Sequence, residues 1–323
     1  MSIPTFSAST TADEVATAFA TEINGRNVLI TGTSLNGIGF ETARVIAKHA
    51  NLVIIAGHNA ERLKLSEEAI KKDSPSANLR TLILDLSSLA SVRKAATEVN
   101  AYPELLHVLV HNAAAALGPF RLTEDGLENQ MATDHVGPFL LTKLLAPKLL
   151  ATSRGAAGYV PRVIFVSSIS QANGSGVDFN TLAHPDPEKY TSLGAYSQAK
   201  TANVLAAIEL TKRAKGRINA YSIHPGIIYT NIYMKKETIP DLQAVGIIGP
   251  DGKPNTQFQW KTIPEGAATT VAAAFDPRLD GTPGAYLSDC VEANKDLAPH
   301  SSDAVSPPFH SSSFYTRNDI LLC

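Results

Sequence analysis

Short apolar runs alternate with helix-length segments along most of the chain. The runs are 28–31, 52–56, 81–84, 108–110, 163–166 and 218–223, and the pattern between them predicts helices to about residue 48, over 60–72 and over 88–99. Apolar strands separated by helices are typical of a parallel sheet covered on both faces. With right-handed crossovers, the pattern predicts an α/β fold with a doubly wound parallel sheet, in a single domain over residues 24–290.

The two ends of the chain depart from this alternation. Residues 1–23 are rich in threonine, serine and alanine and predict an arm with one added helix. Residues 291–323 predict a C-terminal tail, rich in serine and proline, that wraps the surface. No apolar stretch approaches the roughly 18 residues that cross a bilayer, and the first 20 residues hold Asp13 and Glu14 but no lysine or arginine. We therefore expect a cytoplasmic protein without a transmembrane segment.

Composition narrows the range of partners. Hydrophobic residues make up 44% of the 323 positions and charged residues only 18%, which favours extensive burial or self-association as a homodimer or homotetramer. The net charge of −2, with no basic run, predicts no nucleic-acid partner. Cys290 and Cys323 are too few for a disulfide framework. His107 and His111 have no cysteine or carboxylate at metal-ligand spacing, so we expect no metal.

A glycine-rich turn joins the first predicted strand to the first helix. It reads Thr-Gly-Thr-Ser-Leu-Asn-Gly-Ile-Gly over residues 31–39, with glycines at Gly32, Gly37 and Gly39. Glycines allow a tight turn and a close approach to a pyrophosphate, which is stabilised at a helix N-terminus. The turn predicts a dinucleotide site that includes Ser34, Leu35 and Ile38; the alternative is a turn without a ligand.

Several ordered motifs together resemble the short-chain dehydrogenases/reductases, and within them the retinol-dehydrogenase-like members. The turn is similar to the family's Thr-Gly-x-x-x-Gly-x-Gly with one extra residue, and Asn112 stands in a segment similar to Asn-Asn-Ala-Gly. The resemblance covers about residues 24–290 and implies a Rossmann-type fold that binds a nicotinamide cofactor. It places Asp85 and Leu86 at the adenine ring, and Ile228 and Thr230 at the nicotinamide carboxamide.

The residues after the second strand bear on the choice between NAD(H) and NADP(H). The stretch 56–59 reads Ala-Gly-His-Asn, so the carboxylate that accepts the ribose hydroxyls of NAD is missing. His58 stands where many NADP-dependent relatives carry arginine. NADP(H) is therefore favoured and NAD(H) is the alternative. The alternative for His58 is a surface histidine without cofactor contact.

Tyr196 and Lys200 are the candidate catalytic pair. A separation of four places them on one face of a helix predicted to open at Tyr196 and to continue to about Arg213. Free tyrosine ionises near pH 10, so general acid/base work near pH 7 to 8 needs roughly 3–4 kcal/mol of preference for phenolate. A nearby ammonium supplies a few kcal/mol. The alternative is a half-buried tyrosine beside a solvated lysine.

The family's remaining catalytic positions fall on Ser168 and Asp134. By resemblance Ser168 hydrogen-bonds the substrate oxygen, and Ser167 is the competing assignment. Asp134 replaces an asparagine whose main-chain carbonyl is thought to hold a relay water beside the lysine. A carboxylate keeps that carbonyl, but direct pairing with Lys200 would weaken the effect of the ammonium on Tyr196.

These residues predict an NADP(H)-dependent oxidoreductase that interconverts a carbonyl, ketone or aldehyde, and an alcohol. Residues 229–264 form the expected lid, and their apolar side chains suit a polyketide-, terpenoid- or retinoid-like small molecule. The same side chains could instead pack the lid against its own domain or against a second subunit. The alternative function is a catalytically weak dinucleotide-binding or scaffold protein of the same fold.

Overall fold

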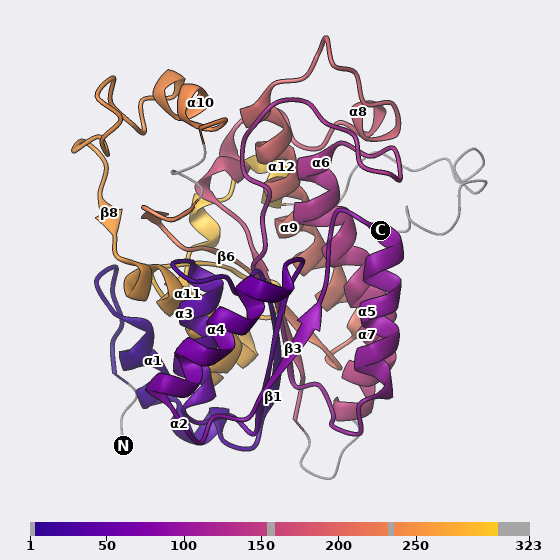
Figure 1. The fold of residues 1–323 in the computed structure, drawn as a ribbon, viewed down its shortest axis with the longest axis vertical. Coiled ribbons are helices and arrows are strands. Elements are labelled where there is room, and N and C mark those ends of the chain that lie inside the picture. The colour runs from indigo at the N-terminus through magenta and orange to yellow at the C-terminus, as the bar shows by residue number, and fades with distance from the viewer. Residues whose placement is uncertain (1–3, 154–158, 232–235, 303–323) are drawn as a thin grey trace.

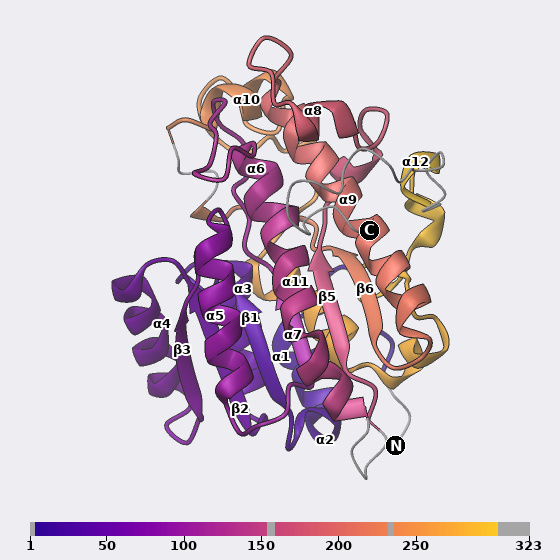
Figure 2. The same cartoon turned by 90° about the vertical axis from the view of Figure 1, so that its right-hand side faces the viewer.

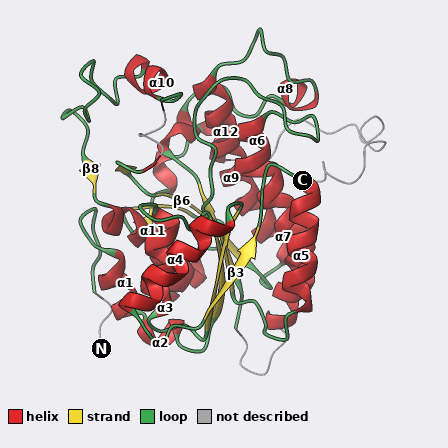
Figure 3. Ribbon diagram, viewed as in Figure 1, coloured by secondary structure: helices red, strands yellow, loops and turns green. Residues whose placement is uncertain are grey.

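A single mostly parallel sheet forms the centre of the molecule (Figures 1 and 3). The computed structural model describes residues 4–153, 159–231 and 236–302. Eight strands lie in the order β10-β9-β6-β5-β4-β1-β2-β3, and only the β9–β10 pair is antiparallel. Their bounds are β1 Asn27–Thr31, β2 Leu52–Gly57, β3 Leu79–Ile83, β4 Val108–His111, β5 Arg162–Val166, β6 Asn219–His224, β9 Tyr286–Ser288 and β10 Val291–Glu292. The predicted doubly wound parallel sheet is confirmed.

Helices cover both faces of the sheet (Figure 2). Helices α1 (Ala12–Ala18), α3 (Ile38–Ala47), α4 (Ala60–Asp73) and α11 (Ile263–Phe275) share one core. Helices α5 (Leu89–Ala101), α7 (Gly137–Ser153) and α9 (Ser192–Ala214) share the other. Alternate residues of one strand feed the two cores: Val28 and Ile30 belong to the first, Leu29 to the second. Both faces of the strands are therefore buried, which explains their continuous apolar runs.

Shorter elements lie outside the two helical layers. They are α2 (Ala20–Ile23), α6 (Asn129–Met131), α8 (Phe179–Ala183), α10 (Ile239–Ala244), α12 (Pro299–Ser302) and the parallel pair β7 (Ile227–Ile228) and β8 (Trp260–Lys261). Helices α8 and α10 lie at the same end of the molecule in both views (Figures 1 and 2). No helix among the described residues is long and apolar enough to span a bilayer.

Two predicted element boundaries were wrong. Helix α9 begins at Ser192 rather than at Tyr196, because the Thr191 side chain accepts a hydrogen bond from the amide of Gly194 and caps the helix there. Tyr196 consequently lies in the second turn. Strand β3 begins at Leu79, two residues before the predicted run, and its first residues are only half-buried at the edge of the sheet. The search for continuous apolar runs missed these residues because they are not fully buried.

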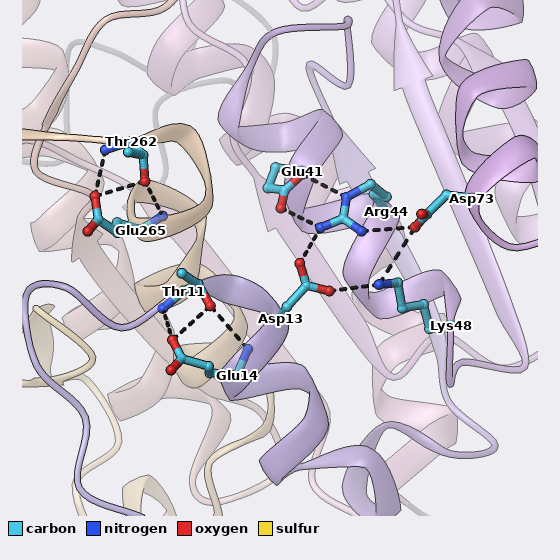
Figure 4. A network of polar contacts seen from close by, with 9 residues as sticks. All are labelled: Thr11, Asp13, Glu14, Glu41, Arg44, Lys48, Asp73, Thr262 and Glu265. Carbon is cyan, nitrogen blue, oxygen red and sulfur yellow. Dashed lines mark hydrogen bonds and ion pairs between the residues drawn. The ribbon is translucent and has the colours of Figure 1, made fainter.

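Charged side chains hold α1 against α3 (Figure 4). Arg44 on α3 pairs with Asp13 on α1, Glu41 on its own helix and Asp73 at the end of α4. Lys48 also pairs with Asp13, at 2.7 Å. Helices α1 and α11, which pack together, both begin with a capping box, Thr11 with Glu14 and Thr262 with Glu265. The added N-terminal helix is thus tied to the domain by polar as well as apolar contacts.

Candidate active site

A cleft of about 600 Å³ opens where the parallel strands end. It is bounded by the last residues of three strands, Thr31 of β1, Gly57 of β2 and Val166 of β5, and by Asn112 directly after β4. This is the edge where open α/β sheets bind ligands. Most of the residues singled out in the sequence line the cleft, namely Gly32, Ser34, Gly37, Ile38, His58, Asp85, Leu86, Asn112, Tyr196, Lys200 and Thr230.

Five residues singled out in the sequence lie behind or beside the lining: Leu35, Gly39, Ile228, Ser168 and Asp134. Gly39 packs so tightly that a Cβ would stand 2.3 Å from Asn112 Nδ2. The Leu35 carbonyl accepts a hydrogen bond of 2.8 Å from Asn231 Nδ2, on the segment after β7. Ile228 is buried against Gly266 of α11. Gly39, Leu35 and Ile228 thus shape the cleft walls rather than face its interior.

The glycine turn leaves room for a pyrophosphate. Gly32 has φ of +72°, and a Cβ there would stand 2.6 Å from Ala113 Cα, so no side chain fits. The extra residue of the turn is absorbed at Asn36, which takes a left-handed φ of +60°. The N-cap of α3 is Gly37, which has no side chain to cap the helix, whereas Asn59 and Ser88 cap α4 and α5. The uncapped amides of α3 suit an anion.

The far end of the cleft carries a cation that the sequence analysis missed. Arg62, in the first turn of α4, lines the cleft together with His58. The Asn59 side chain caps this turn by accepting a hydrogen bond of 3.0 Å from the Arg62 amide. A search for a cation one helical turn beyond His58 would have found it. Asp85 Oδ1 here accepts hydrogen bonds from the amide and hydroxyl of Ser87.

Asn112 holds the two central strands together at the cleft. Its Nδ2 donates to the carbonyls of Thr31 and Gly32, both at 3.0 Å. Its amide donates in turn to the Thr31 hydroxyl, at 3.1 Å. These bonds occupy the side chain at the floor of the glycine turn and fix the turn relative to β4.

Tyr196 and Lys200 lie on the cleft wall with the ammonium behind the phenol. Lys200 is 2% exposed, and its Nζ lies 5.1 Å from the Tyr196 ring centroid. Nζ also donates to the Val166 carbonyl, at 3.2 Å. Burial lowers the pKa of Lys200, but attraction to Asp134 and Tyr196 outweighs burial and holds that pKa above its usual range. The lysine is therefore a buried cation, not a solvated surface residue.

Asp134 lies in the π-helical turn Ala132–Val136 that leads into α7, and its two carboxylate oxygens have different partners. Oδ1 accepts a hydrogen bond of 2.6 Å from the Ala115 amide, in the loop after β4. Oδ2 lies 3.0 Å from Lys200 Nζ, and both side chains are essentially excluded from solvent. The carboxylate thus pairs directly with the lysine.

The two serines after β5 have different hydrogen-bond partners. Ser167 is buried and its hydroxyl donates to the Lys200 carbonyl at 2.7 Å, so its proton is committed to α9 although the residue borders the cleft. Ser168 is half-buried, and its Oγ accepts a hydrogen bond from the Ser170 amide, which leaves the hydroxyl proton free for another acceptor.

A buried histidine and a buried glutamine fix the segment that follows Ser168. His224 Nδ1 accepts a hydrogen bond from the Ile169 amide, and burial lowers the pKa of His224 to about 4, which keeps this ring neutral. Gln171 is fully buried, and its carbonyl accepts hydrogen bonds from Thr201 on α9 and from His300 and Ser301 at α12. The C-terminal segment thereby buttresses the loop that carries Ser168.

Comparisons with known proteins show the family. A family model described as short chain dehydrogenase matches residues 26–180. The short-chain dehydrogenase TIC 32 B, chloroplastic, of Brassica napus is 37% identical over 268 residues, which cover 81% of this chain and 79% of that protein. The chain therefore belongs to the short-chain dehydrogenases, a family of oxidoreductases. It is retinol-dehydrogenase-like: retinol dehydrogenase 12 of Bos taurus is 33% identical over 83% of this chain and 79% of that protein.

Solved structures show the same fold. A short-chain type dehydrogenase/reductase of Mycobacterium marinum superposes with a TM-score of 0.62 at 17% identity and covers 89% of this chain and 98% of its own. A 3-oxoacyl (acyl-carrier-protein) reductase of Agrobacterium tumefaciens with NADP bound superposes with a TM-score of 0.61 at 20% identity, over 83% of this chain and 95% of its own. The recognition made from the sequence motifs is confirmed.

Proposed function

We propose that the protein is an NADP(H)-dependent oxidoreductase that interconverts a ketone or aldehyde and an alcohol on an apolar substrate. The observation that carries the proposal is the Tyr196–Lys200 pair on the wall of a cleft whose other end is the glycine turn. A phenol beside a buried lysine can donate a proton to a substrate oxygen and take it back in the reverse reaction. Proton transfer at the substrate oxygen is the step that such a pair performs.

In the direction of reduction, Tyr196 donates its phenolic proton to the carbonyl oxygen. The free hydroxyl proton of Ser168 donates a hydrogen bond to the same oxygen and stabilises its developing negative charge. Lys200 stabilises the phenolate that remains. A reduced nicotinamide dinucleotide held at the glycine turn would supply the hydride for the carbonyl carbon and would leave oxidised.

The preference for NADP(H) is supported by two basic side chains at the far end of the cleft. Arg62 and His58 both line it, on either side of the Asn59 helix cap. A guanidinium is permanently charged and can hold a 2′-phosphate with two parallel hydrogen bonds, whereas a neutral imidazole offers one donor. Arg62 therefore supplies the charge that the sequence analysis had sought at His58.

An apolar substrate is supported by exposed apolar side chains that neighbour site residues in the chain, Ile169 beside Ser168 and Tyr229 beside Thr230. Ile169, next to Ser168, is 59% exposed, and Tyr229 is 40% exposed. The proposed lid over 229–264 includes Tyr229 and Trp260, whose rings lie 6.2 Å apart; residues 232–235 of this lid lie outside the described residues. A homodimer or homotetramer, a cytoplasmic location and a C-terminal tail over 291–323 stay predictions, although Val291–Glu292 at the start of that tail form β10 of the sheet.

Turnover with a panel of apolar ketones, aldehydes and alcohols tests the proposal. We expect reduction with NADPH to exceed that with NADH, and Tyr196→Phe to abolish turnover while cofactor affinity stays within a few-fold. Residual turnover above one-tenth of wild type would contradict the role of the phenol.

The cofactor assignment needs variants of its own. Arg62→Gln should weaken NADPH binding by about five- to thirtyfold, as expected for one charge-assisted pair near solvent, and leave NADH binding unchanged. His58→Arg should tighten NADPH over the same range. An unchanged NADPH/NADH ratio in both variants would refute the proposed phosphate site.

A second candidate is a catalytically weak dinucleotide-binding protein of the same fold. The observation that favours it is the Asp134–Lys200 ion pair, because a neutralised ammonium stabilises a phenolate less. Cofactor binding would be the same under both functions. Absence of turnover across the panel, with cofactor bound and the fold intact by circular dichroism, would favour this candidate.

A further inference from the structure

The two carboxylate oxygens of Asp134 contact different groups. Oδ1 accepts the Ala115 amide, which ties the π-helical turn to the loop after β4. An asparagine could make this bond equally well with its amide oxygen. The second atom is where the two residue types differ: Oδ2 bears negative charge toward Lys200 Nζ, whereas an asparagine would place an NH₂ group there.

No other counter-charge faces Oδ2. Within the part of the chain that the structure describes, this oxygen receives no hydrogen bond, so the ammonium 3.0 Å away is its sole polar partner. Removal of either partner would leave the other buried and unpaired. Lys200 and Asp134 thus form a buried pair, called the unit below, next to the cleft.

Three further titratable groups interact with the unit or with Tyr196, namely His135, Glu128 and Tyr286. His135, beside Asp134, is buried, and burial lowers its pKa; its Nδ1 pairs with Asn203. Burial raises the pKa of Glu128, which caps α6 and interacts with Asp134. Burial also raises the pKa of Tyr286 on β9, which interacts with Tyr196. None of these groups supplies a second cation to the phenol.

Lys200 is thus shared between the phenol and the carboxylate. Its Nζ lies 5.1 Å from the Tyr196 ring centroid but 3.0 Å from Asp134 Oδ2. A negative charge paired with the ammonium opposes the field that the ammonium exerts on the phenol. The pair therefore acts on Tyr196 more weakly than a lone positive charge would.

We propose that Asp134 is a positioning residue that holds Lys200 in a neutralised pair and thereby keeps the Tyr196 phenol protonated to a higher pH than a free ammonium would allow. The inference rests on the proposed function and adds a pH range to it. Tyr196 remains a proton donor for carbonyl reduction into mildly alkaline solution, and the oxidative reaction, which needs phenolate, rises only at higher pH.

The test is Asp134→Asn, which keeps the Ala115 contact and removes the charge. Rates of reduction and oxidation are measured against pH, because both profiles report the same ionisation. We expect the midpoint of both to move down by at least about half a pH unit, a threefold change in the phenolate fraction. Glu128→Gln, a nearby neutralisation without contact to Lys200, is the matched control and should move the midpoint by less.

A spectroscopic titration separates this inference from the proposed function. The ultraviolet tyrosinate signal of each protein is recorded against pH and the curve of the matching Tyr196→Phe variant is subtracted, which isolates one of the nine tyrosines. The same downward shift is expected in Asp134→Asn even if no substrate in the panel is turned over. Asp134→Ser, which also removes the charge, should reproduce it if the amide variant folds poorly.

Two results would overturn the inference. A midpoint unchanged or raised in Asp134→Asn would show that the carboxylate does not attenuate Lys200. A loss of turnover greater than tenfold with an unshifted midpoint and intact fold would show that the carboxylate itself relays protons or binds substrate. Failure of the wild type to turn over any substrate, with the spectroscopic shift present, would refute the proposed function alone.

Discussion

The ion pairs that hold α1 against α3 and the Lys200–Asp134 pair beside the cleft both join a basic side chain to carboxylates. They differ in their exposure to solvent. Arg44 has three carboxylate partners from three helices, and the side chains of Asp13 and Asp73 are 43% and 41% exposed (Figure 4). Lys200 has one carboxylate partner, and the two side chains are 2% and 0% exposed. The Arg44 network should tolerate substitutions because Arg44 has several carboxylate partners and water reaches two of them. The Lys200–Asp134 pair has no second carboxylate among the described residues and almost no contact with water.

This difference indicates what each arrangement is for. Partly exposed pairs each contribute little, but several of them can dock a helix such as α1. A buried pair costs desolvation that its attraction rarely exceeds, so apolar side chains of the same volume would stabilise the fold as well or better. Stability therefore does not explain Lys200 and Asp134, and their place behind Tyr196 does.

The largest effect is expected from Lys200→Met. It leaves the Asp134 carboxylate buried without a counter-charge, so the free energy of unfolding should fall by about 3–5 kcal/mol and turnover should be lost. The double variant Lys200→Met/Asp134→Leu should recover most of that stability but none of the activity. Urea unfolding and turnover measure the two effects. Lost stability in the double variant as well would show that the pair is needed for folding.

Acid should weaken the fold through buried histidines before it affects the N-terminal network. Burial lowers the pKa of His107 and His224 to about 4 and that of His111 to about 3, against about 6.5 in the unfolded chain. Between these values the unfolded chain binds protons that the folded chain does not, so stability falls as pH falls. Three such groups lower the free energy of unfolding by up to about 4 kcal/mol per pH unit.

Urea unfolding at pH 7, 6 and 5 measures this dependence. His107→Asn should reduce the slope by about one third, because one of the three protons is no longer taken up on unfolding. The carboxylates of the network contribute only at lower pH: Lys48 and Arg44 outweigh the burial of Asp13 and lower its pKa, so its stabilising effect is lost below the ordinary carboxyl range. A flat stability between pH 7 and 5 would contradict the burial of these rings.

The fold was predictable from the sequence because its dominant signal is local. Runs such as 28–31 and 52–56 are apolar on both faces, and the structure buries them in two cores. Helix α9 was misplaced at its start because the deciding feature is a single capping bond at Thr191. Strand β9 was not predicted, since it has only three residues, Tyr286–Ser288, and depends on pairing with β6.

Motif positions in the sequence predicted which residues belong to the site. They did not predict contacts that depend on how separate elements pack. Tyr196 and Lys200 are four residues apart in the chain, so their shared helix face follows from helix geometry. Arg62 was missed because its relation to the cleft depends on where α4 starts after β2. The Ser167 hydroxyl donates to the Lys200 carbonyl, 33 residues further along the chain, and no local sequence pattern predicts this hydrogen bond.

A smaller effect than that of Lys200→Met is expected from Arg44→Met. The Arg44 side chain is 17% exposed and that of Glu41 is 8% exposed, so loss of the guanidinium leaves a mostly buried carboxylate with a missing partner. We expect a loss of about 1–3 kcal/mol in the free energy of unfolding, with turnover unchanged. Arg44→Lys keeps the charge but loses the planar guanidinium, so its free energy of unfolding should lie between those of the wild type and Arg44→Met. A loss of turnover would show that the network reaches the cleft.

The smallest effect is expected from Asp13→Asn. Its carboxylate contacts Arg44 and Lys48, but Asp73 pairs with both of these cations and remains in place. The free energy of unfolding should therefore fall by less than about 1 kcal/mol, the usual value for a partly exposed pair. Because salt screens exposed charges, the difference from wild type should vanish in about 1 M NaCl.

Asp134→Asn provides the matched measurement for the buried pair. Its Oδ2 and Lys200 Nζ are excluded from solvent, so the effect of the substitution should be the same in low and high salt. Urea unfolding of both variants at two salt concentrations makes the comparison. Equal salt dependence in Asp13→Asn and Asp134→Asn would mean that water and ions reach the Lys200 pair, and the carboxylate could then no longer attenuate the ammonium as a desolvated partner does.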